Sequence, residues 1–248
     1  MGGLFHNLRH PRRCYVVCAI ARSGSNFLTD GLRTTGRAGR PKQFFLPKYQ
    51  PTYAAKNGLA GTDFADYVRG IIAATATSNE VFGFKLMGWY LAEFLGRLRE
   101  TGAFGADDDE ELDILRTAFP RLQFIQIVRL NKIRQAVSKA RAAQTGLWKV
   151  QEGNVANGEA EFDPDLIASC LEDTQREERI WAEFFQRIGL NPLCVVYEEL
   201  CEDYSGTIGR VLDYLEIKLP RSVRPKPETV RQTDSLSREW EERFLALA

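Results

Sequence analysis

The chain of 248 residues is 44% hydrophobic and 27% charged, so it can bury a full core; this predicts a single domain spanning residues 1–248 and excludes a disordered chain or a coiled coil. Its formal net charge is zero, yet residues 1–60 hold ten Lys and Arg against the single acid Asp30, an excess that favours an anionic ligand such as a nucleotide over a merely solvated basic surface. Because no apolar run reaches the roughly 18 residues of a membrane span, and the N-terminus lacks the apolar stretch of a signal peptide, we expect a cytoplasmic protein without a membrane span.

Strand-like and helix-like patterns alternate along the chain. Short apolar runs rich in β-branched and aromatic residues predict strands at 14–21, 81–86, 123–128 and 193–197. Apolar residues at spacings of three and four predict helices at 26–35, 64–77, 89–99, 132–145, 165–188 and 204–215, and polar stretches predict loops at 102–111 and 151–163. Near-continuously apolar strands that alternate with helices predict an α/β fold, with a parallel sheet flanked by helices on both faces.

Several common chemistries lack the residues that they need. The five cysteines are scattered and include no CxxC pair, which argues against a disulfide framework and a zinc site. The only histidines are His6 and His10, so neither Ser-His-Asp catalysis nor a His-ligated metal is expected. No helix pattern carries a continuous basic stripe with base-reading residues, so nucleic acid is not the expected partner.

The segment after the first predicted strand has the features of an anion-binding loop. Arg22, Ser23, Gly24, Ser25 and Asn26 lead directly into an apolar helix. Such a junction offers unpaired backbone N–H groups and the positive end of a helix dipole, to which the serines add hydroxyls and the arginine a charge. Simple helix capping by a Ser or Asn is the plainer interpretation. Neither GxxxxGK[ST] nor GxGxxG occurs, which argues against an ordinary ATPase and a dinucleotide-binding protein.

A second basic site follows the third predicted strand. Arg129 comes directly after that strand, and the next helix carries Arg134, Ser138 and Arg141. Ligands in open α/β sheets bind beyond the carboxyl ends of the strands, so this site and the loop after the first strand meet at one edge. Two anion sites suit a nucleotide with two phosphate groups.

The sequence resembles a known family, the bacterial sulfotransferases typified by trehalose 2-sulfotransferase. The resemblance covers nearly the whole chain and rests on short motifs that occur in one order at matching spacings: CAIARSGS at 18–25, LRTTG at 32–36, AGRPKQFF at 38–45, GFKLM at 83–87, QAVS at 135–138, RA at 141–142, QT at 144–145, PKP at 225–227, RQ at 231–232 and EW at 239–240. It implies a P-loop-like sulfotransferase fold and the donor 3′-phosphoadenosine-5′-phosphosulfate (PAPS), with no metal cofactor. Family members are often homodimers.

The resemblance also implies roles for individual residues. Arg22, Ser23, Gly24, Ser25 and Asn26 would hold the 5′-phosphosulfate of the donor, and Arg129 and Ser138 its 3′-phosphate. The segment 40–46 would line the site of a small-molecule acceptor, possibly a carbohydrate or glycolipid, through Arg40, Pro41, Gln43, Phe44, Phe45 and Leu46.

Two positions depart from the family pattern. The family usually has a glutamate, its proposed general base, where this chain has Gln43. Members that use trehalose have a glutamine just before the loop arginine, where this chain has Ala21, which argues against trehalose as acceptor. The first departure leaves open whether the chain turns over or is a weak or inactive homologue that only binds the nucleotide.

Sulfuryl transfer depends mostly on positioning and charge stabilisation. Arg22 and the loop N–H groups would stabilise the charge that grows on the leaving oxygen. Lys85, near the end of the second predicted strand, is a further candidate, with pairing to a carboxylate as the alternative. We therefore expect Gln43, Arg22 and Lys85 to be the catalytic positions.

Three explanations of Gln43 compete. Another carboxylate, such as Asp63, acts as base, the acceptor is acidic enough to need little help, or the base has been removed. Gln43 can still orient a hydroxyl by hydrogen bonding. Our hypothesis from the sequence is that Gln43→Glu raises turnover, because a general base typically contributes 10² to 10⁴ in rate.

A different class of protein is also compatible with the sequence: a phosphoryl-transfer enzyme with an unusual anion loop. It predicts Mg²⁺-dependent binding of ATP, whereas the sulfotransferase needs no metal and prefers a 3′-phosphorylated adenosine.

Overall fold

The computed structural model describes residues 11–106, 110–148, 158–220, 222–227 and 235–247. Its centre is a parallel sheet with the strand order β2-β1-β3-β4, made of β1 (Arg13–Ala19), β2 (Val81–Met87), β3 (Gln123–Val128) and β4 (Leu193–Val196). β1 is therefore a central strand, with β2 on one side and β3 on the other. The predicted α/β fold with a parallel sheet is confirmed.

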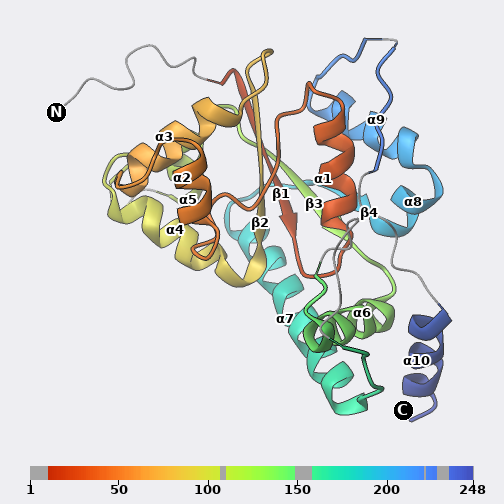
Figure 1. Ribbon diagram of the computed structural model, residues 1–248. Helices are drawn as coiled ribbons and strands as arrows, with labels where there is room; N and C mark the ends of the chain where they lie inside the picture. The colour runs from red at the N-terminus through yellow and green to blue at the C-terminus, as the bar shows by residue number, and fades with distance from the viewer. Residues whose placement is uncertain (1–10, 107–109, 149–157, 221, 228–234, 248) are drawn as a thin grey trace.

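Helices cover both faces of this sheet and its lower edge (Figure 1). They are α1 (Ser25–Thr34), α2 (Gln50–Lys56), α3 (Phe64–Thr75), the 3₁₀ turn η1 (Gly88–Tyr90), α4 (Leu91–Glu100), α5 (Glu111–Ala118), α6 (Lys132–Thr145), α7 (Pro164–Arg187), α8 (Tyr197–Glu202), α9 (Tyr204–Tyr214) and α10 (Ser235–Leu245). In Figure 1, α2 to α5 lie on one side and α1, α8 and α9 on the other, while α6, α7 and α10 gather below the carboxyl ends of the strands. Within the described part of the chain, no helix combines the length and apolar character that crossing a membrane requires.

The strands are buried on both faces, as their composition predicts. Every residue of β2 is buried, including Lys85, and in β1 only Arg13 is partly exposed. β-Branched and aromatic side chains pack well on a sheet that helices cover on both sides. In the register of the sheet, Val17 of β1 lies beside Lys85, and Ala19 lies beside Met87. The carboxyl ends of these two strands are thus level with each other.

The predicted strands and six predicted helices are all present, with ends that differ by at most two residues. Four helices were not predicted: α2, α5, α8 and α10. One boundary was wrong, because Tyr197 begins α8 and does not end β4. The predicted loop at 102–111 ends where α5 begins, and residues 107–109 and 149–157, like His6 and His10, lie outside the described part of the chain.

The longest described helix, α7, packs against the carboxyl end of the central strand β1. Asp163 caps its N-terminus by accepting a hydrogen bond from the N–H of Leu166 at 2.9 Å, and Pro164 suits the first helical turn. Its aromatic residues Trp181, Phe184 and Phe185 are buried. The indole Nε1 of Trp181 donates to the carbonyl of Ala19 at 3.0 Å, which ties α7 to the last residue of β1.

This tie is testable by Trp181→Phe, which keeps an aromatic ring but removes the indole N–H. We expect the free energy of unfolding to fall by about 1–3 kcal/mol, because the buried carbonyl of Ala19 loses a donor. Trp89→Phe is the matched control; Trp89 is 56% exposed, so its change should stay within about 0.5 kcal/mol. Urea unfolding measures both. Equal stability of Trp181→Phe and the wild type would show that the tie contributes nothing.

Candidate active site

The chain turns sharply between β1 and α1. Arg22 has a φ of 62° and Gly24 a φ of 88°, so two residues of this loop adopt the left-handed conformation. Ser23 lies beneath the turn, where its Oγ donates to the carbonyl of Ile20 at 2.9 Å. Left-handed backbone is uncommon for a residue with a side chain, and such residues concentrate at functional sites. The loop thus leaves Arg22 half-buried and buries Ser23.

Gly24 is required here for two reasons. It is the N-cap of α1 with positive φ, and a Cβ at this position would lie 2.2 Å from Cδ2 of Tyr197. The aromatic ring therefore packs directly on the loop backbone. No side chain caps α1, so the N–H groups of its first turn remain available to an anion.

Two arginines converge on this loop from different parts of the chain. The Nε of Arg22 donates to Oγ of Ser138 at 2.9 Å, and its Nη1 donates to the carbonyl of Trp148 at 2.6 Å. Arg129, which follows β3, donates from Nη1 to the carbonyl of Arg22 at 3.3 Å and lies 4.9 Å from the ring centre of Tyr197. The two predicted anion sites form one continuous group.

Lys85 adds a third positive charge from β2. Its Nζ donates to Oδ1 of Asn26 at 2.5 Å and lies 3.4 Å from Oγ of Ser25. The side chain is buried and reaches from the strand to the first turn of α1. This contact places the predicted catalytic lysine at the loop.

The positive charge of the two arginines is poorly compensated. Burial, and then the charge of Arg129, lower the pKa of Arg22 to about 10. Burial also lowers the pKa of Arg129, against the opposing influence of Tyr197 and Glu198. Among the described residues neither arginine forms a salt bridge, and Nε of Arg129 has no hydrogen-bond partner. Because a buried charge without a partner is costly, this arrangement favours a bound anion.

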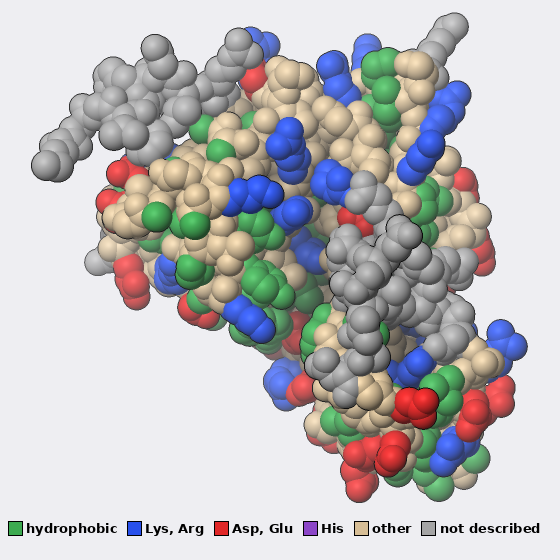
Figure 2. All heavy atoms as spheres, viewed as in Figure 1, with side chains coloured by type: hydrophobic (Ala, Val, Ile, Leu, Met, Phe, Trp, Pro, Cys, Tyr) green, Lys and Arg blue, Asp and Glu red, His purple; other side chains and the backbone are tan. Residues whose placement is uncertain are grey.

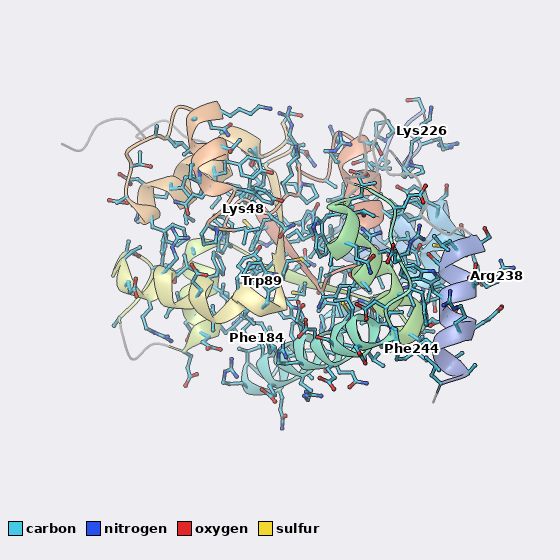
Figure 3. The ribbon with its side chains drawn as sticks, turned by 60° about the horizontal axis from the view of Figure 1, so that its bottom comes forward. Lys48, Trp89, Phe184, Lys226, Arg238 and Phe244 are labelled. Carbon is cyan, nitrogen blue, oxygen red and sulfur yellow. The ribbon has the colours of Figure 1, made fainter. Side chains whose placement is uncertain are left out.

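A cavity of about 750 Å³ opens beside the loop, a size typical of small-molecule sites. Figure 3 looks toward this edge of the molecule, with Lys48 and Trp89, two lining residues, labelled on one side and Phe244 of α10 on the other. In Figure 2, several Lys and Arg side chains lie in the middle of the face, between α2 on the left and α1 on the right. The predicted residues that line the cavity are Arg22, Gly24, Ser25, Asn26, Gln43, Leu46, Lys85, Arg129 and Ser138.

The predicted acceptor segment reaches the cavity only in part. The N–H of Lys85 donates to the carbonyl of Lys42 at 2.9 Å, so the segment runs beside β2 and brings Gln43 next to the lysine. Phe44 and Phe45 do not line the cavity: both are buried, and the Phe45 ring centre lies 5.2 Å from that of Phe84. Apolar burial accounts for this inward packing. The two other predicted positions also lie outside the lining: Arg40 is exposed, and Pro41 is buried.

Several lining residues were not predicted because they come from distant segments. Tyr49 and Trp89 contribute exposed aromatic rings on one side, and Trp148 and Tyr197 contribute rings near the arginines. α6 and α7 add a charged group: Lys139, Asp173, Arg176 and Glu177. Among these residues, Tyr197 carried a signal in the sequence, since it ends a predicted strand at the ligand-binding edge. The described residues contain no cluster of His, Cys, Asp and Glu suited to a metal ion.

Comparisons with known proteins define the class. The chain is 32% identical to trehalose 2-sulfotransferase of Mycolicibacterium smegmatis, over 95% of both chains. It is 28% identical to trehalose 2-sulfotransferase of Mycobacterium tuberculosis, over 95% of this chain and 96% of the relative. Among solved structures, the sulfotransferase domain from the Synechococcus PCC 7002 olefin synthase aligns with a TM-score of 0.47 and 12% identity, over 88% of this chain and 78% of that one. The identity to the M. smegmatis relative, along nearly the whole of both chains, shows that the chain is an enzyme of the sulfotransferase class.

The family follows from a match along nearly the whole sequence. The model of the family described as Stf0 sulphotransferase matches residues 14–246. The chain belongs to this family, and the resemblance found in the sequence is confirmed.

The close packing of Tyr197 on the loop is testable by Gly24→Ala. Gly36 is a matched control, because it also has positive φ, yet a Cβ there would meet nothing within 4 Å. We expect Gly36→Ala to lose about 1–2 kcal/mol for left-handed backbone alone and Gly24→Ala to lose clearly more, because the loop or the tyrosine must move. Urea unfolding of both variants checks this, and equal losses would contradict the close contact.

Proposed function

We propose that this sulfotransferase takes its sulfuryl group from PAPS and transfers it to a hydroxyl of a small-molecule acceptor such as a carbohydrate or glycolipid. One observation carries the choice of donor: Arg22 and Arg129 converge on an uncapped helix N-terminus, with no salt bridge among the described residues. Two positive charges held together in this way need an anion with more than one charged group, and a nucleotide with phosphates at both the 5′ and 3′ positions provides it.

The contacts support a division of labour within the site. The loop of residues 22–26 and Lys85 would hold the 5′-phosphosulfate, because first-turn N–H groups, a guanidinium and an ammonium all lie there. Arg129 and Ser138 would hold the 3′-phosphate. The hydroxyl of Ser138 accepts a hydrogen bond from Arg22, so its own proton is free to point at a phosphate oxygen. The hydroxyl of Ser23 supports the loop from within and would not contact the donor.

The proposed reaction is an in-line displacement. The acceptor oxygen forms a bond to sulfur, the bond from sulfur to the bridging oxygen breaks, and 3′-phosphoadenosine-5′-phosphate (PAP) leaves with the charge on that oxygen. Arg22, Lys85 and the loop N–H groups would stabilise this charge, because they are already held in place before the reaction. Removing one such donor typically costs 10² to 10³ in kcat.

The residues that line the cavity indicate which kind of acceptor it suits. Three of the six exposed large hydrophobic residues among the described ones line it: Tyr49, Trp89 and Trp148. Aromatic faces suit the apolar face of a sugar ring or another flat molecule. Ala21 also lines the cavity and offers no polar group where trehalose-using members of the family place a glutamine, which argues against trehalose.

A second candidate is a homologue that binds PAPS or PAP and turns over weakly or not at all. The observation in its favour is that Gln43, a neutral side chain, lines the cavity beside Lys85 where the family has its glutamate. The homodimer implied by the family resemblance, the cytoplasmic location and the single domain stay predictions.

The donor is testable by calorimetric titration with PAP and with 5′-AMP. We expect PAP to bind at least about tenfold more tightly, a difference of about 1.4 kcal/mol, and Arg129→Ala to abolish that preference by removing the partner of the 3′-phosphate. Arg210→Ala is the control, because this exposed arginine pairs with Glu199 outside the cavity lining and should leave the preference unchanged. Equal affinity of the wild type for both nucleotides would contradict PAPS as donor.

A further inference from the structure

One side of the cavity carries two carboxylates that the donor site does not use. Two of the described carboxylates line it, those of Asp173 and Glu177, one turn apart on α7. The family glutamate is absent at Gln43, so each of these groups is a candidate for the missing base. Asp63, the carboxylate considered from the sequence, is not: it is exposed, caps the N-terminus of α3 and does not line the cavity.

The backbone of α7 places Glu177 at the reacting end of the sheet. Trp181, one turn further along, is tied to the last residue of β1. The carbonyl oxygen of Glu177 would lie 3.2 Å from a Cβ built on Gly88, the residue that follows β2. Glu177 is therefore next to the carboxyl ends of both strands from which the loop and Lys85 extend.

The environment of Glu177 suits proton transfer better than that of Asp173. Glu177 is 5% exposed, its Oε1 lies 3.8 Å from Nζ of Lys139, and its Oε2 is buried without a hydrogen-bond partner. Asp173 is closer to Lys139, at 3.3 Å, and also pairs with Arg176. A carboxylate held by two cations is a poor base, whereas an under-bonded, buried carboxylate retains a lone pair for a substrate proton.

We propose that Glu177 is the general base that removes the proton from the acceptor hydroxyl in this sulfotransferase. The assignment rests on the proposed function. The acceptor O–H bond breaks and its proton passes to a carboxylate oxygen of Glu177 while the acceptor oxygen bonds to sulfur, and the electron pair of the S–O bond leaves with PAP. Solvent takes the proton after the sulfated product departs.

The charges around Glu177 are consistent with this role. Burial raises its pKa above the ordinary value, and Asp173 acts in the same direction. Lys139 of α6, the N–H of Trp89 in η1 and Arg176 of α7 oppose the rise. Asp173 differs: burial acts to raise its pKa, but Lys139 and Arg176 prevail and lower it. Glu177 is thus the stronger base of the pair, and a base works best when its pKa lies near the operating pH.

A structural ion pair with Lys139 is the competing explanation of Glu177, and Glu178 offers a matched control for it. Glu178 follows Glu177 on α7, pairs with Lys132 and does not line the cavity. We compare Glu177→Gln with Glu178→Gln by measuring the release of PAP from PAPS, with trehalose and with water alone as acceptor. PAP affinity is measured by calorimetry in the same samples.

We expect Glu177→Gln to lower kcat/KM about 100-fold or more in the faster of the two reactions, with PAP affinity unchanged within about twofold of the wild type and Glu178→Gln at wild-type activity. In the wild type, kcat/KM should rise with pH as Glu177 ionises, and this rise should be absent from the pH profile of Glu177→Gln. If Glu177 had only a structural role, the substitution would lower stability or PAP affinity and leave the rise of kcat/KM with pH in place.

Other results overturn the assignment. Unchanged kcat/KM in Glu177→Gln would contradict Glu177 as the base. A wild type that binds PAP but releases none from PAPS would also contradict it, while leaving the proposed donor site intact. A wild type that fails to prefer PAP over 5′-AMP would contradict the proposed function itself.

The vacant position at Gln43 supplies a second, independent test. This proposal replaces the hypothesis from the sequence that Gln43→Glu raises turnover. With Glu177 in place, Gln43→Glu adds a base where one already exists, so we expect little gain in kcat. In the Glu177→Gln background the same change restores a base to the cavity, and we expect a gain of about tenfold or more. Substitutions at two positions that serve the same function are expected to have non-additive effects on the rate. Equal gains in both backgrounds would show that Glu177 does not act as the base.

Discussion

The positive charge gathered at the carboxyl ends of the strands is the constraint on which the rest of the site depends. Arg129 is buried, Arg22 is half-buried, and their pKa values are lowered mainly by burial. The chain supplies backbone and hydroxyl oxygens as partners, from Trp148, Arg22 and Ser138, but the described residues supply no carboxylate in a salt bridge with either arginine. Such an arrangement is pre-organised for an anion and is held in place by a sheet whose first strand is central.

The two proposed roles, donor binding and removal of the acceptor proton, belong to opposite sides of the cavity. The loop side is basic and built from the ends of β1, β2 and β3, so it suits the donor and its leaving oxygen. The α7 side carries Glu177, whose Oε2 has no partner, and suits the acceptor proton. Between them lie exposed aromatic rings, which are neutral and flat. The loop side of the cavity is therefore basic, whereas the side formed by α6 and α7 combines two carboxylates with the cations Lys139 and Arg176.

Periodicity was sufficient to predict the sheet and six helices, because buried parallel strands and amphipathic helices leave strong patterns. The loop residues and Arg129 could also be predicted, since they directly follow strands. Phe44 and Phe45 were placed at the acceptor by their neighbours in a motif, yet aromatic burial draws both into the core while Gln43 and Leu46 stay at the cavity. Glu177 lies within an amphipathic helix far along the chain, and only tertiary packing, through Trp181 and Ala19, brings it to the site.

The central position of β1 also has a consequence for the order in which the protein folds. The loop of residues 22–26 is synthesised early, but Arg22 forms hydrogen bonds with Ser138 and Trp148, which lie 116 and 126 residues further along the chain. Trp181, whose indole binds the carbonyl of Ala19, lies 162 residues after Ala19. Pairings of such long range pay their loop-closure entropy before any contact is gained, and therefore form slowly. During synthesis on the ribosome, the first strand and its basic loop emerge long before their partners. The contacts of Arg22 with Ser138 and Trp148 form only once those residues have been made, and the bond from Trp181 to Ala19 follows with α7.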